Sequence, residues 1–147
     1  MTQVTGDVIY SEMNQGKGAV ALSRELYSNS KSVASTLCYG AEWDAAIKFI
    51  TSNSEHANYD KDSSGKGCYG LPIAKTGMND DYSTNNIYDM AGNLWEWTME
   101  ASISTSRVIR GGNTNRTGVA TPASTRSVNY CADPFSTASF RISLYIK

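Results

Sequence analysis

The spacing of the apolar residues changes along the chain, and this change constrains the fold more than any other feature of the sequence. Residues 40–53 carry apolar side chains at i, i+3, i+4 and i+7, opposite the charged ones, so they predict an amphipathic helix. Residues 15–28 predict a shorter helix of the same kind. The apolar positions are Trp43, Ala46, Ile47 and Ile50 in the longer helix and Val20, Leu22, Leu26 and Tyr27 in the shorter one.

Further along the chain the period falls to two, which is the period of a strand. The segment "LWEWT", residues 94–98, alternates two tryptophans with Leu, Glu and Thr. "RVIR", residues 107–110, predicts a short strand ending at Gly111 and Gly112, where two glycines permit a sharp turn. Residues 140–146 predict a half-buried strand, with Phe140, Ile142, Leu144 and Ile146 on its apolar side and Arg141, Ser143 and Tyr145 on the other.

Helices therefore come first and strands last, separated by a polar stretch from Thr51 to Asn86 that is too long for a plain connection. We expect that stretch to be an ordered surface excursion. The order predicts an α+β domain with two helices, a small antiparallel sheet and long loops, rather than a parallel βαβ fold. At 147 residues, the chain fits a single domain over residues 1–147.

Composition limits the classes of function. No apolar run approaches the roughly 20 residues that span a bilayer, and the first residues lack the pattern of a signal peptide, so we expect no membrane insertion. Three widely spaced cysteines indicate free thiols, and the single histidine is expected to be solvated. Residues 104–147 carry one acid against six bases, but the arginines are scattered, so nucleic-acid binding is not expected.

The segment "NIYDMAGNLWEW", residues 86–97, resembles the signature of the formylglycine-generating, sulfatase-modifying-factor family. "STLCYGAEWDAAIKF", "RVIRGG" and "FRISLYI" are similar to further segments of that family and follow in its order, so the resemblance covers roughly residues 35–147. It implies an elaborated C-type lectin-like fold of the formylglycine-generating-enzyme type.

The resemblance also implies a calcium site. In the family this segment wraps a calcium ion, and the matching ligands would be the side chains of Asp89 and Glu96 with the carbonyls of Gly92 and Leu94. Two carboxylates and backbone oxygens on a glycine-bent loop suit a hard cation. The alternative is that both carboxylates only form hydrogen bonds within the turn and that the two tryptophans are core residues.

The oxidase members of the family bind copper with two cysteines that follow the "RGG" motif, because Cu(I) prefers sulfur donors. Arg116 and Thr121 occupy those positions here, and Cys131 lies too far along the chain. The related iron-dependent sulfoxide synthases require a histidine cluster, which one histidine cannot supply. We therefore expect no catalytic residues, no copper and no enzymatic activity.

The same scaffold is used by variable proteins of diversity-generating retroelements, in which codons of the AAC or AAT type are mutated at their adenines. Such codons cannot become Lys, Glu, Gln, Met or Trp. Residues 1–103 contain twenty-two residues of these types and residues 104–146 contain none, where the upstream frequency predicts about nine. Strands and turns are also poor in several of these types, which weakens the inference without removing it. Residues 104–146 are therefore a candidate variable region.

Within this region, the loop and strand positions that do not match the framework of the family are candidate ligand-binding residues. Tyr130 and Phe135 would supply contact area, and the Asn and Thr side chains adaptable hydrogen bonds. The candidates are Asn113, Thr114, Asn115, Val119, Ala120, Thr121, Val128, Asn129, Tyr130, Cys131 and Phe135. The framework positions expected to support this surface are Arg110, Gly111, Gly112, Pro122, Arg126, Phe140 and Arg141.

The sequence thus predicts a non-catalytic protein that binds a ligand through one diversified face. The expected ligand is a protein or glycan on a cell surface, and the expected location is a phage tail or a bacterial cell surface. The alternatives are a copper-dependent oxidase of the formylglycine-generating type and an undiversified lectin-like module with a carbohydrate-binding or structural role.

Overall fold

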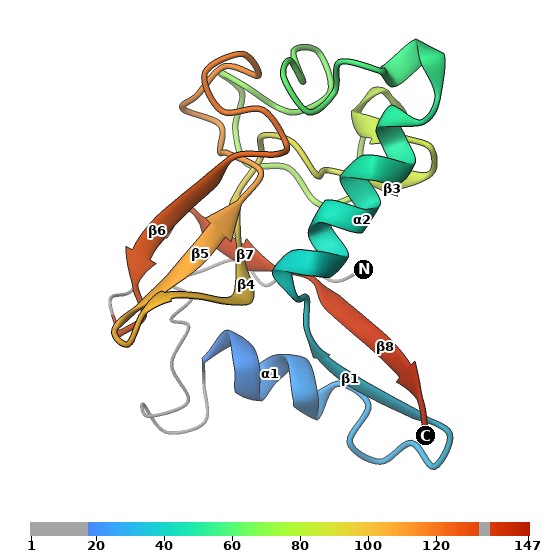
Figure 1. The fold of residues 1–147 in the computed structure, drawn as a ribbon, viewed down its shortest axis with the longest axis vertical. Helices are drawn as coiled ribbons and strands as arrows, with labels where there is room; N and C mark the ends of the chain where they lie inside the picture. The colour runs from blue at the N-terminus through green and yellow to red at the C-terminus, as the bar shows by residue number, and fades with distance from the viewer. Residues whose placement is uncertain (1–17, 133–135) are drawn as a thin grey trace.

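The computed structural model describes residues 18–132 and 136–147. These residues form one α+β arrangement of two α-helices, two short 3-10 helices and eight strands (Figure 1). In chain order the elements are α1 (Ala19–Glu25), β1 (Val33–Leu37), α2 (Gly40–Thr51), η1 (Ser54–His56), η2 (Asp80–Tyr82), β2 (Ser83–Thr84), β3 (Ile87–Tyr88), β4 (Trp95–Ile103), β5 (Ser106–Arg110), β6 (Arg126–Tyr130), β7 (Ala138–Phe140) and β8 (Ile142–Ile146).

The strands form three small sheets. The largest has four strands in the order β6-β5-β4-β7, with antiparallel neighbours except for the parallel pair β4 and β7. β1 pairs with β8 as an antiparallel ribbon, and β2 pairs with β3. In Figure 1, α1 and the ribbon lie at one end of the molecule, and the long loops gather at the other end, beyond β5 and β6.

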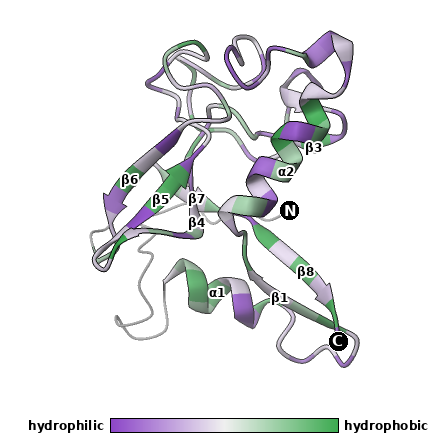
Figure 2. Ribbon diagram, in the orientation of Figure 1, coloured by the Kyte–Doolittle hydropathy of each residue, from purple (hydrophilic) through white to green (hydrophobic). Residues whose placement is uncertain are grey.

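Two apolar clusters form the core. One joins α1 and β1 to the four-stranded sheet through Val20, Leu37, Trp97 and Phe140. The other lies around α2, where Trp43, Ile47 and Ile50 pack on Tyr59 and Met90. The stripe predicted for the longer helix is therefore confirmed, with Ala46 half-buried at its edge. Figure 2 shows both hydrophobic and hydrophilic residues along α2, as expected for a helix with one buried face.

The shorter helix differs from its prediction. α1 ends at Glu25, so Leu26 and Tyr27 lie beyond it and are exposed. Ser23, which is not among the predicted apolar positions, is buried, and its hydroxyl donates a hydrogen bond to the carbonyl of Val20 at 2.7 Å. A small hydroxyl that is paired locally can enter a core position at little cost.

The two period-two segments also differ from prediction. All of residues 94–98 are buried. Trp95 and Trp97 belong to the cluster that contains Phe140, while the polar Glu96 and Thr98 are paired with Arg141 and with the carbonyl of Val108. The final segment breaks at Arg141 into β7 and β8, and only β7 enters the main sheet. β8 pairs with β1 alone, which leaves Leu144 and Ile146 exposed rather than buried.

The predicted surface excursion between Thr51 and Asn86 is ordered by short local elements. η1, η2 and β2 lie in it, and Asn53 and Asn79 cap the two 3-10 helices by accepting hydrogen bonds from Glu55 and Asp81. The segment therefore holds its shape without an apolar core of its own.

A buried ion pair joins the last strands to the central strand. The Arg141 guanidinium donates to both carboxylate oxygens of Glu96, at 2.6 Å and 2.7 Å, and also to the carbonyls of Tyr88 and Asp89 at 3.2 Å and 3.4 Å. It also lies 5.4 Å from the ring centroid of Trp43. One side chain thus connects β4, α2 and the turn before β4.

Removing this pair is expected to destabilise the fold strongly. Glu96→Gln should lower the free energy of unfolding by about 3–5 kcal/mol, because the buried Arg141 loses its counter-charge. Glu100→Gln is the matched control, since Glu100 also lies on β4 but pairs with the largely exposed Arg126, and should cost no more than about 1 kcal/mol. Urea denaturation followed by tryptophan fluorescence measures both. Equal losses of unfolding free energy in the two variants would show that the Glu96–Arg141 pair stabilises the fold no more than the Glu100–Arg126 pair does.

Candidate ligand-binding surface

The loop between β5 and β6 is held through its backbone. Gly111 and Gly112 begin it with φ of 85° and 76°, a region that favours glycine. The carbonyl of Gly111 accepts a hydrogen bond from Gly92 at 2.7 Å, and Thr114 donates to the carbonyl of Asn93 at 3.1 Å. The carbonyl of Thr114 in turn accepts from Gly70 at 2.7 Å.

The second half of the loop is hydrogen-bonded to α2 and to the polar segment of residues 51–86, which we call the polar excursion. The carbonyl of Gly118 accepts from Ser63 at 3.2 Å, and the Ser63 hydroxyl accepts from the backbone of Ala123 at 2.8 Å. The Trp43 indole donates to the carbonyl of Ala123 at 2.9 Å. Gly118 lies so close to the backbone of Ser64 that a Cβ there would collide with it. These bonds use backbone atoms of the loop, so they do not depend on its side chains.

The candidate side chains of this loop differ in exposure. Asn115, Val119 and Ala120 are exposed, with Val119 63% accessible. Asn113 is buried, and its side-chain oxygen accepts a hydrogen bond from the backbone of Asn115 at 3.2 Å. Thr121 is half-buried against Gly112. The exposed positions can meet a ligand directly, whereas the buried ones also shape the loop.

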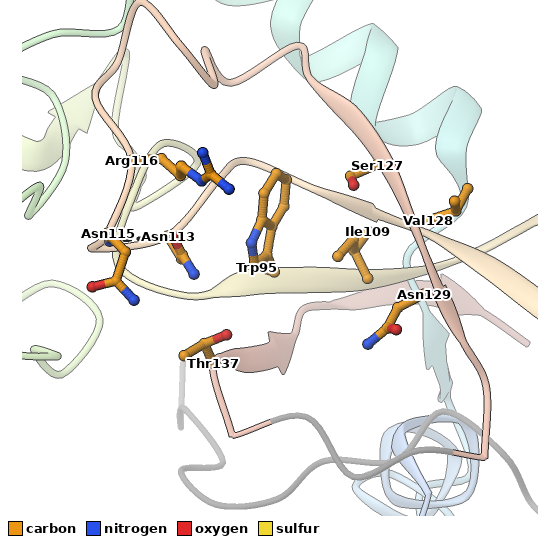
Figure 3. A pocket seen from close by; sticks show the side chains of 9 residues that line it. All are labelled: Trp95, Ile109, Asn113, Asn115, Arg116, Ser127, Val128, Asn129 and Thr137. Atoms are coloured by element: carbon orange, nitrogen blue, oxygen red, sulfur yellow. Dashed lines mark hydrogen bonds between the residues drawn. The ribbon is translucent and has the colours of Figure 1, made fainter.

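A pocket of about 340 Å³ lies between this loop and the edge of the sheet (Figure 3). Trp95 and Ile109 line its apolar part. Its polar lining comes from the loop, from β6 and from the residue before β7. The lining residues are Trp95, Ile109, Asn113, Asn115, Arg116, Ser127, Val128, Asn129 and Thr137. The structure therefore brings Asn113, Asn115, Val128 and Asn129 of the sequence-based set to one place. We refer to this site as the Trp95 pocket.

A second pocket of about 370 Å³ shares Asn115 and Arg116 with the Trp95 pocket. Tyr69 and Gly70 of the polar excursion form its other wall, and Thr114 and Thr117 complete it. We refer to it as the Tyr69 pocket. Because both pockets use the same two residues, a substitution at either of them changes both sites.

The candidates on β6 do not share one face. Side chains alternate across a strand, so Val128 and Tyr130 point to the side opposite Ser127 and Asn129. Val128 and Tyr130 are exposed. The period of a strand therefore distributes the candidates on β6 to two surfaces, and Val128 borders the Trp95 pocket as well.

Cys131 is a candidate that lines neither pocket. Cys131 is half-buried and packs against the core cluster that contains Trp97 and Phe140, so it is not a ligand-facing side chain in this arrangement. Phe135 lies outside the described residues. Val119, Ala120 and Thr121 line neither pocket.

Sequence reasoning missed Trp95, Ile109, Arg116, Ser127 and Thr137 as lining residues. The sequence suggested a core position for Trp95 only as an alternative, and both Trp95 and Ile109 are in fact buried while they line the pocket. Arg116 carried a usable signal, since it is the only charged residue between Arg110 and Arg126.

The residues proposed for calcium are arranged around Arg141 instead. Both carboxylate oxygens of Glu96 accept hydrogen bonds from Arg141, and a carboxylate oxygen of Asp89 accepts from the backbone of Gly77 at 2.9 Å. Burial raises the pKa of Asp89, partly offset by the bond from Gly77 and by the charge of Arg141. Among the described residues no group of three or more His, Cys, Asp or Glu side chains is placed to hold a metal. A cation bound by Asp89, Gly92, Leu94 and Glu96 would therefore compete with Arg141 for Glu96, and the calcium site stays a prediction.

The free thiols are poorly suited to metal or redox chemistry. Burial, followed by the charge of Glu96, raises the pKa of Cys38 to about 12, and burial also raises that of Cys68. Both are therefore protonated at neutral pH, whereas copper binding requires thiolates. At the positions of the copper-binding cysteines, Arg116 faces the pockets and Thr121 packs on Gly112.

The fold is similar to that of two solved structures. Treponema denticola variable protein 1 matches with a TM-score of 0.56 at 19% sequence identity, over 74% of this chain and 47% of that one. The crystal structure of CarF matches with a TM-score of 0.65 at 15% identity, over 94% of this chain and 71% of that one. This chain thus spans about half the length of the variable protein. No protein-family model matches the chain, and no curated protein matches its sequence.

At these identities the likeness establishes the fold. The chain has the α+β, C-type lectin-like fold of the formylglycine-generating-enzyme type that the motif around Trp95 implies, and one of the two similar structures is a variable protein. Among the described residues, no helix combines the length and the apolar character needed to cross a membrane.

Calcium is expected not to raise the melting temperature, because a cation on Asp89 and Glu96 would have to displace Arg141 from both oxygens of Glu96. Thermal melts with calcium and with a chelator measure the effect, and magnesium controls for ionic strength. A gain specific to calcium that Glu96→Gln abolishes would instead establish the cation site.

Proposed function

We propose that this protein is a non-catalytic ligand-binding protein that displays a diversified surface on a C-type lectin-like fold. The observation that carries the proposal is the way the loop from Gly111 to Thr125 is held. Most of its hydrogen bonds with residues 59–93 and with α2 are made by its own backbone groups, with the Ser124 hydroxyl, which donates to the carbonyl of Asp60, as the exception. Asn115, Arg116 and Val119 are exposed. Such a loop keeps its path when its side chains change.

The composition of the candidate variable region, residues 104–146, supports the same proposal. The residue types missing from 104–146 are those that mutation of AAC or AAT codons cannot produce, and this span contains the loop, β6 and most of the lining of the Trp95 pocket. The expected ligand is a protein or glycan on a cell surface, presented to a phage tail or a bacterial surface protein. The arginines are separated and mostly paired, so no nucleic-acid partner is proposed.

The oxidase alternative has less support. It would require thiolates where this chain has Arg116 and Thr121, and the Cys38 and Cys68 thiols are buried away from the pockets. An undiversified lectin-like module has the same fold, so only the tests below separate it from the proposal.

The loop is expected to tolerate side-chain change. Asn115→Ser, Val119→Asn and Ala120→Tyr should each change the free energy of unfolding by no more than about 0.5 kcal/mol, because these side chains are exposed. Gly118→Ala, in the same loop, should cost about 1–3 kcal/mol, because its Cβ meets the backbone of Ser63 and Ser64. Urea denaturation measures all four. Large losses at the exposed positions would mean that the loop cannot be diversified.

The gene provides the direct test of diversification. We expect codons derived from AAC or AAT at the exposed loop and β6 positions, and an adenine-rich template repeat with a reverse transcriptase gene nearby. Sequencing the DNA around the gene checks this. If it shows neither the codons nor the repeat, the undiversified lectin-like module is the correct alternative.

A further inference from the structure

Arg116 is the one charged side chain among the described residues that line the Trp95 pocket and the Tyr69 pocket, and no carboxylate lines either. Arg110, Arg126 and Arg141 are each paired with a carboxylate, of Asp44, Glu100 and Glu96 respectively. Arg116 is exposed and forms no ion pair with any carboxylate in the described part of the chain. Its charge is available to a ligand.

Two amides add hydrogen-bond donors to the Trp95 pocket. The side-chain oxygen of Asn113 accepts from the backbone of Asn115 at 3.2 Å, and that of Asn129 accepts from the backbone of Tyr130 at 2.9 Å. Because their oxygens are engaged by backbone N–H groups, both side chains offer their NH₂ groups, which can only donate. Among the described residues the pocket therefore combines a guanidinium and two amide donors without an acidic side chain, which favours an anionic ligand group.

The rest of the pocket suits a polyhydroxylated ring. Figure 3 shows the Arg116 guanidinium extending from the loop toward Trp95, with Asn113 beside it and Asn129 across the pocket. Ser127 and Thr137 supply hydroxyls that can donate or accept, and the small accessible parts of the otherwise buried Trp95 and Ile109 supply an apolar surface. An aromatic surface surrounded by amides and hydroxyls matches the apolar faces and the hydroxyl rim of a sugar better than the mixed side chains of a peptide.

We propose, on the basis of the proposed ligand-binding function, that the Trp95 pocket binds a carboxylated sugar. Arg116 and the two amides hold the carboxylate and neighbouring hydroxyls, and the ring packs against Trp95 and Ile109. The Tyr69 pocket, on the other side of Asn115 and Arg116, accepts the next unit of a chain of such sugars. The ligand is thus an acidic glycan rather than a neutral one.

Glucuronate and glucose are matched probes, because they differ mainly in the carboxylate. We expect glucuronate to bind with a dissociation constant of about 1 mM, as is usual for a single small group, and to shift the NMR signals of the Trp95 indole and of the Asn113 and Asn129 amides. Glucose should produce much smaller shifts. Arg116→Gln should weaken glucuronate binding about tenfold or more, and Arg116→Lys less, because it keeps the charge but loses the planar fork.

Lys61→Gln is the control, since Lys61 is an exposed cation on the neighbouring segment and lines neither pocket. It should bind glucuronate as the unchanged protein does. The proposal is overturned if glucuronate causes no shifts at these residues, if glucose binds equally well, if Arg116→Gln binds as before, or if an acidic tripeptide binds where glucuronate does not. These outcomes leave the result of the gene test unchanged, so the two proposals fail separately.

Discussion

The bidentate contact between Arg141 and Glu96 is the interaction on which the rest of the structure depends. It connects the end of the chain to the central strand and to the turn that contains Asp89. The indole of Trp43 has Arg141 over it at 5.4 Å and Arg110 at 5.9 Å, and the same indole donates to the loop at Ala123. Trp43 therefore links the ion pair to the candidate binding loop, in addition to the backbone bonds that hold the loop to Gly70 and Asn93.

This arrangement separates support from recognition. Backbone groups and buried side chains such as Ser63 fix the course of the loop, while the exposed side chains of the loop contribute little to holding the fold. The stability of the domain and the chemistry of its surface can therefore change independently, which is rarely possible when a loop is held by its own side chains. The same separation explains how a loop of Asn, Thr and Gly can be ordered without an apolar core.

The sequence predicted the parts of the fold that have a strong local pattern. The stripe of α2 follows from helical spacing, and the motif around Trp95 identified the fold class. β6 was not predicted, because the alternation in "RSVNY" is limited to Val128 and Tyr130, and the segment forms a strand by pairing along its whole length with β5. The exposure of Leu144 and the role of Glu96 were also missed, since both depend on which distant segments pack together.

The lining of the binding site was also predicted only in part. The loop and β6 were chosen because they depart from a familiar framework, and four of those residues do line the Trp95 pocket. Its walls come from β4, β5 and the residue before β7, which only the folded arrangement brings near the loop. Asn113 illustrates how little the sequence says about burial in a loop, because a polar residue among polar neighbours gave no indication that it would be buried.

The position of β6 at the edge of the sheet has a consequence for how such a protein could evolve. Neighbouring codons in this strand encode side chains on opposite surfaces, with Ser127 and Asn129 on one side and Val128 and Tyr130 on the other, although Val128 also borders the pocket. One mutated stretch of DNA would therefore supply two separate repertoires at once. A substitution that strengthens binding on one surface of β6 need not disturb a contact made by the other surface of the same strand.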